Sequence, residues 1–95
     1  MIKTYRTRPR TVEAFKWDGM LLLAEEVAPW LLDALNRGPG HPNSIFRHAD
    51  VLQVWDDVGQ ILYCHVGAWV VWFPDVEALT VMTDAEFKAA MEEVP

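Results

Sequence analysis

The segment that organises this chain reads Thr11-Val12-Glu13-Ala14-Phe15-Lys16-Trp17, followed by Asp18-Gly19. β-Branched and aromatic residues favour a strand, and the Asp-Gly pair that follows predicts the turn that ends it. Successive side chains of a strand point to opposite faces. We therefore expect Phe15 and Trp17 to share one face of a sheet and Ala14 to lie on the other.

The residues before this strand are basic, whereas the rest of the chain is acidic. Five basic residues and one glutamate give residues 1–17 a formal charge of +4, while three basic and thirteen acidic residues give residues 18–95 a charge of −10. Proline disfavours the α region for the residue before it, so Arg8-Pro9 favours an extended backbone. We expect residues 1–10 to form a basic extended arm, with Arg6, Arg8 and Arg10 on one side of it.

Residues 21–36 have the apolar spacing of an amphipathic helix, with Val27, Trp30 and Leu31 on one face. Pro29 lacks the N–H that a helix interior requires. Either the helix kinks there, or it begins near Pro29, where proline is favoured. The glycine- and proline-rich residues 38–43 predict a mobile surface loop.

The second half of the chain predicts β structure followed by a closing helix. Residues 51–56 and 60–66 flank a glycine-containing turn and predict a hairpin, and residues 69–73 and 79–82 predict two more strands. The sequence Thr83-Asp84-Ala85-Glu86 is a capping box, which marks the start of a helix with Phe87, Ala90, Met91 and Val94 on one face. The predicted fold class is α+β, a mostly antiparallel sheet of four to five strands with two helices covering one face.

Length and composition limit the class of protein. Ninety-five residues predict a single domain, 1–95, and 52% apolar with 23% charged residues is an ordinary globular balance. The single cysteine, Cys64, excludes an internal disulfide framework and favours a reducing compartment. No apolar run reaches the length of a membrane span, and no signal peptide is recognisable. We expect a cytoplasmic protein that does not insert into membranes.

The sequence contains no pattern that predicts catalysis, a cofactor or a metal site. Cys64 and His65 are neighbours in a predicted strand, where they point to opposite faces, and His41 and His48 do not have a zinc-ligand spacing. No helix N-terminus or oxyanion loop is predicted beside Cys64, so we interpret it as a packing residue. No glycine-rich phosphate loop is present. We expect a protein that is not an enzyme and holds no metal or cofactor.

The aromatic strand Trp69-Val70-Val71-Trp72-Phe73 is the predicted binding surface. A sheet with helices on one side leaves its other face open, and tryptophan is enriched at binding hot spots. Whether these rings belong to the core, to an interface or to a homodimer contact stays open, because the chain has five tryptophans and a small domain cannot hide all of them. We take Trp69, Trp72 and Phe73, together with the three arginines of the arm, as the candidate site.

Two interpretations of the charge pattern are possible. The arm could contact phosphates, but the acidic remainder would repel nucleic acid, so we expect the arm to pair with the acidic part of the same protein or of a sister subunit. An acidic mimic of DNA is the opposite interpretation. The acidic residues alternate with apolar ones, however, and do not form the dense rows that mimicry requires.

The two ends of the chain resemble a family of small bacteriophage and prophage proteins. The resemblance rests on Tyr5-Arg6-Thr7-Arg8-Pro9, Val12-Glu13-Ala14 and Trp17, and on Gly67-Ala68-Trp69-Val70-Val71 and Asp84-Ala85-Glu86-Phe87 further on. The resemblance is weak between Leu21 and Val66. In the family the position of Ala68 is acidic, and the position of Met91 is often aromatic.

The resemblance implies a setting rather than a reaction. It implies a phage or prophage accessory protein in the cytoplasm of a bacterial host. Our leading hypothesis is a non-enzymatic module, expected to form a homodimer, that binds and modulates a host protein through the aromatic strand and the basic arm. The alternatives are a binder of a nucleotide-like signal, held between tryptophans and the arginines of the arm, and a structural protein of the virion.

Overall fold

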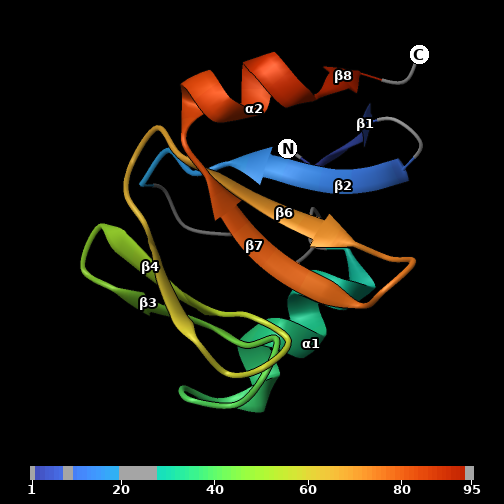
Figure 1. Ribbon diagram of the computed structural model, residues 1–95. Coiled ribbons are helices and arrows are strands. Elements are labelled where there is room, and N and C mark those ends of the chain that lie inside the picture. Colours follow the sequence, from blue (N-terminus) through green and yellow to red (C-terminus); the bar gives the residue numbers. More distant parts are fainter. Residues whose placement is uncertain (1, 8–9, 20–27, 94–95) are drawn as a thin grey trace.

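The computed structural model describes residues 2–7, 10–19 and 28–93. Within these ranges it contains eight strands and two helices (Figure 1). The elements are β1 (Lys3–Thr7), β2 (Arg10–Lys16), α1 (Pro29–Arg37), β3 (Ile45–His48), β4 (Val51–Trp55), β5 (Ile61–Cys64), β6 (Trp69–Phe73), β7 (Ala78–Met82), α2 (Asp84–Ala90) and β8 (Glu92–Glu93). The α+β class predicted from the sequence is confirmed.

The strands form two antiparallel sheets rather than the single sheet that we predicted. Sheet A has five strands in the order β7-β6-β2-β1-β8, and sheet B has three in the order β3-β4-β5. The predicted hairpin over residues 51–66 is present as β4 and β5, with Leu52 opposite Cys64. It pairs with β3, which the sequence analysis missed, instead of extending sheet A.

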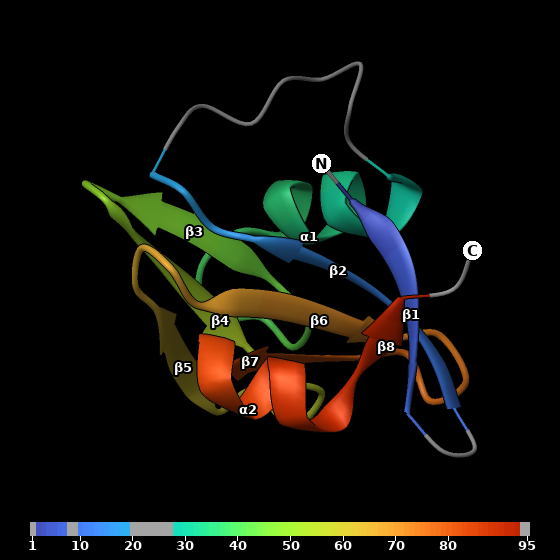
Figure 2. The same ribbon diagram turned by 90° about the horizontal axis from the view of Figure 1, so that it is seen from above.

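The two helices lie on opposite faces of sheet A, so our expectation that both cover one face is wrong. Figures 1 and 2 show α2 on one side of sheet A, with α1 and sheet B on the other. The side of α2 holds a core cluster of Val12, Ala14, Val71 and Phe87. The physical reason is that β2 and β6 are apolar on both faces, and each apolar face requires its own cover.

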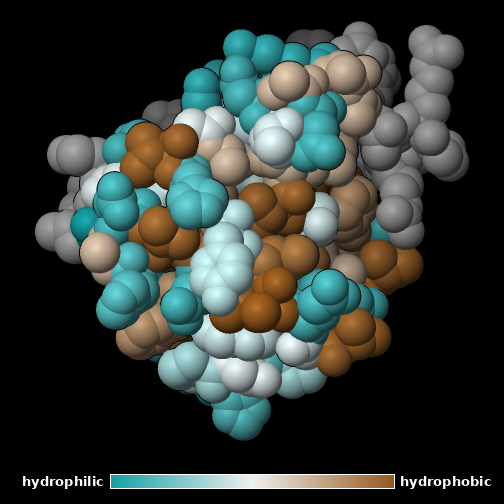
Figure 3. Space-filling model, turned by 60° about the vertical axis from the view of Figure 1, so that its left-hand side comes forward, coloured by the Kyte–Doolittle hydropathy of each residue, from teal (hydrophilic) through white to brown (hydrophobic). Residues whose placement is uncertain are grey.

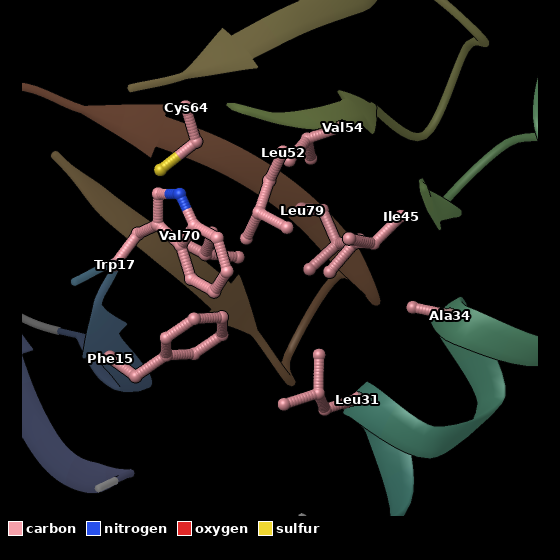
Figure 4. Packing of buried hydrophobic residues seen from close by; sticks show 10 residues of the cluster. All are labelled: Phe15, Trp17, Leu31, Ala34, Ile45, Leu52, Val54, Cys64, Val70 and Leu79. Atoms are coloured by element: carbon pink, nitrogen blue, oxygen red, sulfur yellow. The ribbon is translucent and has the colours of Figure 1, made fainter. Parts of the chain in front are cut away.

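The larger core cluster fills the space between sheet A, sheet B and α1 (Figure 4). Phe15 and Trp17 enter it from the β2 side, as the alternation predicted, and Leu31 and Ala34 enter it from α1. The indole Nε1 of Trp17 donates a hydrogen bond to the backbone oxygen of Asp50 at 2.7 Å. This bond lets a tryptophan that is only 1% exposed satisfy its polar atom inside the core.

The helix ends follow the local sequence. The described part of α1 begins at Pro29, in the first turn where a missing N–H costs nothing, which confirms one of the two alternatives for this proline. The first half of the predicted helix, residues 21–27, lies outside the described residues. Thr83 and Glu86 form both hydrogen bonds of the predicted capping box of α2. Phe87 of the predicted helix face is buried, whereas Ala90 is exposed.

Among the described residues of the predicted arm, only residues 3–7 form one extended strand, and this strand does not stand apart from the domain. Residues 3–7 form β1, which pairs with β2 on one side and with β8 on the other. The pairing with β8 joins the two ends of the described chain, as Figure 2 shows. The basic N-terminal segment is therefore an interior strand of sheet A.

Candidate functional site

The aromatic strand β6 is covered on the side that faces α2. The rings of Trp69 and Phe87 are stacked, with centroids 3.8 Å apart and an interplanar angle of 4°. The indole Nε1 of Trp69 also donates to Oδ1 of Asp84 at 3.0 Å. Phe73 packs against the same cluster and is half-buried. Trp69 and Phe73 thus lie between sheet A and its covering helix.

The other side of β6 is covered by α1. Trp72 stacks on Trp30 with ring centroids 5.7 Å apart, and Trp30 lies 6.5 Å from Phe15. Trp17 and Trp55 are buried, whereas Trp30, Trp69 and Trp72 are half-buried, which agrees with the expectation that the domain cannot hide every tryptophan. Since Trp30 and Trp72 stack directly on each other, a planar ligand between them would have to displace one of the rings.

The arginines of the predicted site occupy two different strands. Arg6 belongs to β1 and Arg10 to β2, and the two strands run antiparallel. Arg8 lies outside the described residues, as do the side chains of Arg6 and Arg10. The chain therefore reverses direction between Arg6 and Arg10, where we expected one extended arm carrying all three arginines.

One face of sheet B, which was not predicted from the sequence, is left open by the described residues. We call it the outer face of sheet B, and it comprises, by the alternation of the strands, Phe46, His48, Val51, Gln53, Trp55, Ile61 and Tyr63. Trp55, at one end of this face, is buried. Phe46 and Tyr63 flank Gln53 in one cross-strand row, and they are 41% and 53% exposed. Figure 3 turns the side of the molecule that carries β3 and β4 toward the reader, and hydrophobic side chains gather there among hydrophilic ones.

Local sequence explains why this face is apolar and open. Alternate residues of β5 point inward and outward, so the partly buried Leu62 and the buried Cys64 pack on the core while Ile61 and Tyr63 point outward. In β3, Ile45 is buried and Phe46 is exposed for the same reason. Both described helices pack against other surfaces, on sheet A or on the inner side of sheet B. The pattern in Ile61-Leu62-Tyr63-Cys64, with large side chains on both faces, was the signal that could have identified this surface.

Two turns bound the outer face and both carry acidic residues. Asp50 lies in the turn between β3 and β4, and Asp56 and Asp57 lie in the turn between β4 and β5. Oδ1 of Asp56 accepts hydrogen bonds from the backbone N–H groups of Val58 and Gln60, which fixes the second turn. Asp50 and Asp57 are exposed at opposite ends of β4.

Asn43 holds a further acidic turn beside this one. Its backbone N–H donates to the oxygen of Asp56 at 3.0 Å. Its side-chain Nδ2 donates to the backbone oxygen of Glu77 at 2.6 Å, and its Oδ1 accepts from the N–H of Leu79. The turn between β6 and β7, which contains Asp75 and Glu77, is thereby joined to the acidic end of sheet B.

Arg47 lies on the other side of β3, away from the outer face. Its guanidinium carbon is 5.4 Å from the centroid of the Trp17 ring. Its Nε donates to the oxygen of Ala49, and its Nη2 donates to the oxygen of Gly19. The guanidinium of Arg47 thus binds backbone oxygens at the edge of the core and not the carboxylates of the two turns.

Cys64 is unsuited to nucleophilic chemistry in this fold. Burial disfavours the charged thiolate and raises the pKa of the Cys64 thiol to about 12. In Figure 4 its sulfur points toward the ring of Trp17, inside the core.

In the described part of the chain, no three His, Cys, Asp or Glu side chains gather in a group fit to hold a metal ion. None of the helices in that part is long and apolar enough to cross a membrane.

Comparison with known proteins gives no further assignment. No protein-family model matches this sequence, and neither a curated protein nor a solved structure matches it significantly.

Proposed function

We propose that this domain is a non-enzymatic binding module that engages a protein partner through the outer face of sheet B. The observation that carries the proposal is the pair Phe46 and Tyr63, which are exposed together on a face that neither described helix covers. Aromatic side chains are enriched at protein interfaces because each buries a large area at a small cost in conformational entropy. A rigid antiparallel sheet holds them in fixed positions, which reduces the entropy lost on binding.

The resemblance to small bacteriophage proteins directs the search for the partner to a bacterial host. A protein of this kind would act in the cytoplasm of that host by occupying a surface of a host protein. Binding of a nucleotide-like ligand receives less support, because Trp30 and Trp72 already stack on each other. A role in the virion would instead predict that the protein co-purifies with phage particles.

The test is affinity capture from a bacterial lysate with mass spectrometry. The bait is the tagged protein, compared with a Phe46→Ser/Tyr63→Ser double variant. Leu32 on α1 and Val76 after β6 are 48% and 52% exposed, so Leu32→Ser/Val76→Ser is a control of matched exposure elsewhere on the surface. All three baits are first checked by circular dichroism and urea unfolding.

We expect one stoichiometric protein on the wild type and on the control, and its loss from the Phe46/Tyr63 variant. Equal capture by a folded Phe46/Tyr63 variant would overturn the proposal. Substitution of Trp69 or Trp72 is a poorer probe, because both rings are part of the packing between layers.

A further inference from the structure

The charges around the outer face of sheet B define the kind of partner that it fits. Residues 44–83, which supply all of sheet B and the turns that bound it, contain five acidic residues and one basic residue. Arg47 binds backbone oxygens at the edge of the core. A second cation, Arg37 of α1, binds the backbone oxygens of Pro42 and Asn43 beside the turn of Asp56. The five carboxylates still outnumber these two cations. A ligand approaching this face therefore meets an apolar centre with negative charge at its ends.

The spacing of these charges limits the length of the complementary segment. Asp50 precedes β4 and Asp57 follows it closely, so the two carboxylates mark the ends of a five-residue strand. A strand rises about 3.3 Å per residue, which places the two ends of β4 about 17 Å apart. An extended segment of about six or seven residues spans that distance.

The size of the apolar centre also favours a short segment over a folded partner. Full burial of an aromatic ring removes about 150–250 Å², so the exposed parts of Phe46, Ile61 and Tyr63 offer on the order of 300 Å². A stable pair of folded proteins buries about 800 Å² on each side. A little over half of that area, roughly 450 Å², is apolar in a typical interface. The apolar area of this face is therefore smaller than a stable dimer of this domain requires and is adequate for one side of a peptide.

We propose that the outer face of sheet B binds a short, extended, cationic segment of its protein partner. Its apolar side chains pack on Phe46 and Tyr63, and lysine or arginine at its two ends lies near Asp50 and Asp57. This inference rests on the proposed function and names the chemistry of the partner.

The test uses two fluorescein-labelled heptapeptides that differ only in charge. One has lysine at both ends and alternating valine and threonine between them, and the other has glutamate at both ends. Fluorescence anisotropy is measured against the full chain at low and at physiological salt. Asp57→Asn is compared with Asp33→Asn, because both changes remove one exposed carboxylate but Asp33 lies on α1.

We expect the lysine peptide to bind at least about 10-fold more tightly than the glutamate peptide, and salt to reduce the difference. Asp57→Asn should weaken binding of the lysine peptide by about 2- to 5-fold, as expected for loss of an exposed ion pair. Asp33→Asn should leave the affinity for this peptide unchanged. Tyr63→Ser should weaken it by about 10-fold or more.

The inference would be overturned if the two peptides bound equally well or if neither bound. It would also be overturned if Asp33→Asn weakened binding as much as Asp57→Asn. The same holds if Tyr63→Ser dissociates a dimer of the free protein, since the occupant would then be a second copy. None of these results decides the proposed function, which depends separately on capture from the lysate.

Discussion

The indole Nε1 of Trp69 donates a hydrogen bond to Oδ1 of Asp84 at 3.0 Å, and this contact joins β6 to the first turn of α2. The same carboxylate lies 3.0 Å from Nζ of Lys88 and 3.5 Å from Nζ of Lys16. The hydrogen bond from Trp69, then the bond from Lys88, lowers the pKa of Asp84 from 3.8 to about 2. Asp84 therefore holds the helix that covers Trp69.

The Asp84→Asn variant should lose less stability than the wild type as the pH falls through the acid range. The pKa of Asp84 is lower in the folded protein than in the unfolded chain, so its contribution is complete above pH 3.8 and is lost as the pH falls toward about 2. We expect Asp84→Asn to lower the midpoint of urea unfolding at neutral pH, and the difference from wild type to shrink through this acid range. The variant Asp33→Asn serves as the control, and a difference that stays constant with pH would contradict the assignment.

Trp17 and Trp30 should lose different amounts of stability when the indole N–H is removed. Trp17→Phe leaves the oxygen of Asp50 without its donor and opens a cavity, so we expect a loss of about 2–3 kcal/mol of unfolding free energy. The Nε1 of Trp30 is buried and has no hydrogen-bond partner among the described residues, so Trp30→Phe should cost less than about 1 kcal/mol. Urea unfolding of both variants measures the two values. Equal costs would show that ring packing, and not the N–H, dominates at both positions.

Replacement of alanine by glycine should stabilise the turn between β3 and β4 but destabilise α2. Ala49, between β3 and β4, has φ of 55°, in the left-handed region that is strained for alanine. We expect Ala49→Gly to raise the free energy of unfolding by about 0.5–1 kcal/mol, because glycine relieves that strain. The matched change Ala89→Gly in α2 should lower it by a similar amount. Destabilisation by Ala49→Gly, measured by thermal unfolding, would mean that the entropy of the unfolded chain outweighs the strain.

Local sequence predicted the elements whose signals are local. The alternation in residues 11–17 predicted the faces of Phe15 and Ala14, and Thr83 with Glu86 predicted the start of α2. The sequence did not predict β3, which is short, or the pairing of β1 with β8, which joins distant parts of the chain. Such pairings depend on which apolar faces pack against each other in the folded chain, and the periodicity of a single segment does not predict this packing.

The outer face of sheet B was not predicted from the sequence for the same reason. Trp69 and Trp72 look like surface residues of an open sheet as long as their neighbours are unknown. Phe87 and Trp30, from elements far along the chain, cover them. Phe46 and Tyr63 are exposed because sheet B folds over the larger core cluster and turns its second face to solvent. The sequence contained their alternation, but it did not indicate that both described helices would pack elsewhere.

The thiol of Cys64 should report on unfolding rather than on chemistry. Its side chain is buried in the core, and its pKa is raised to about 12, so the folded protein presents almost no thiolate near neutral pH. We expect the reaction with Ellman's reagent in native buffer to be at least about 1,000-fold slower than in the unfolded chain, because it must wait for opening of the core. In concentrated urea the same reagent should titrate one thiol per chain, which provides the reference rate. Rapid stoichiometric reaction in native buffer would show that the strand carrying Cys64 opens independently of the core, and would also weaken the case for a rigid outer face of sheet B.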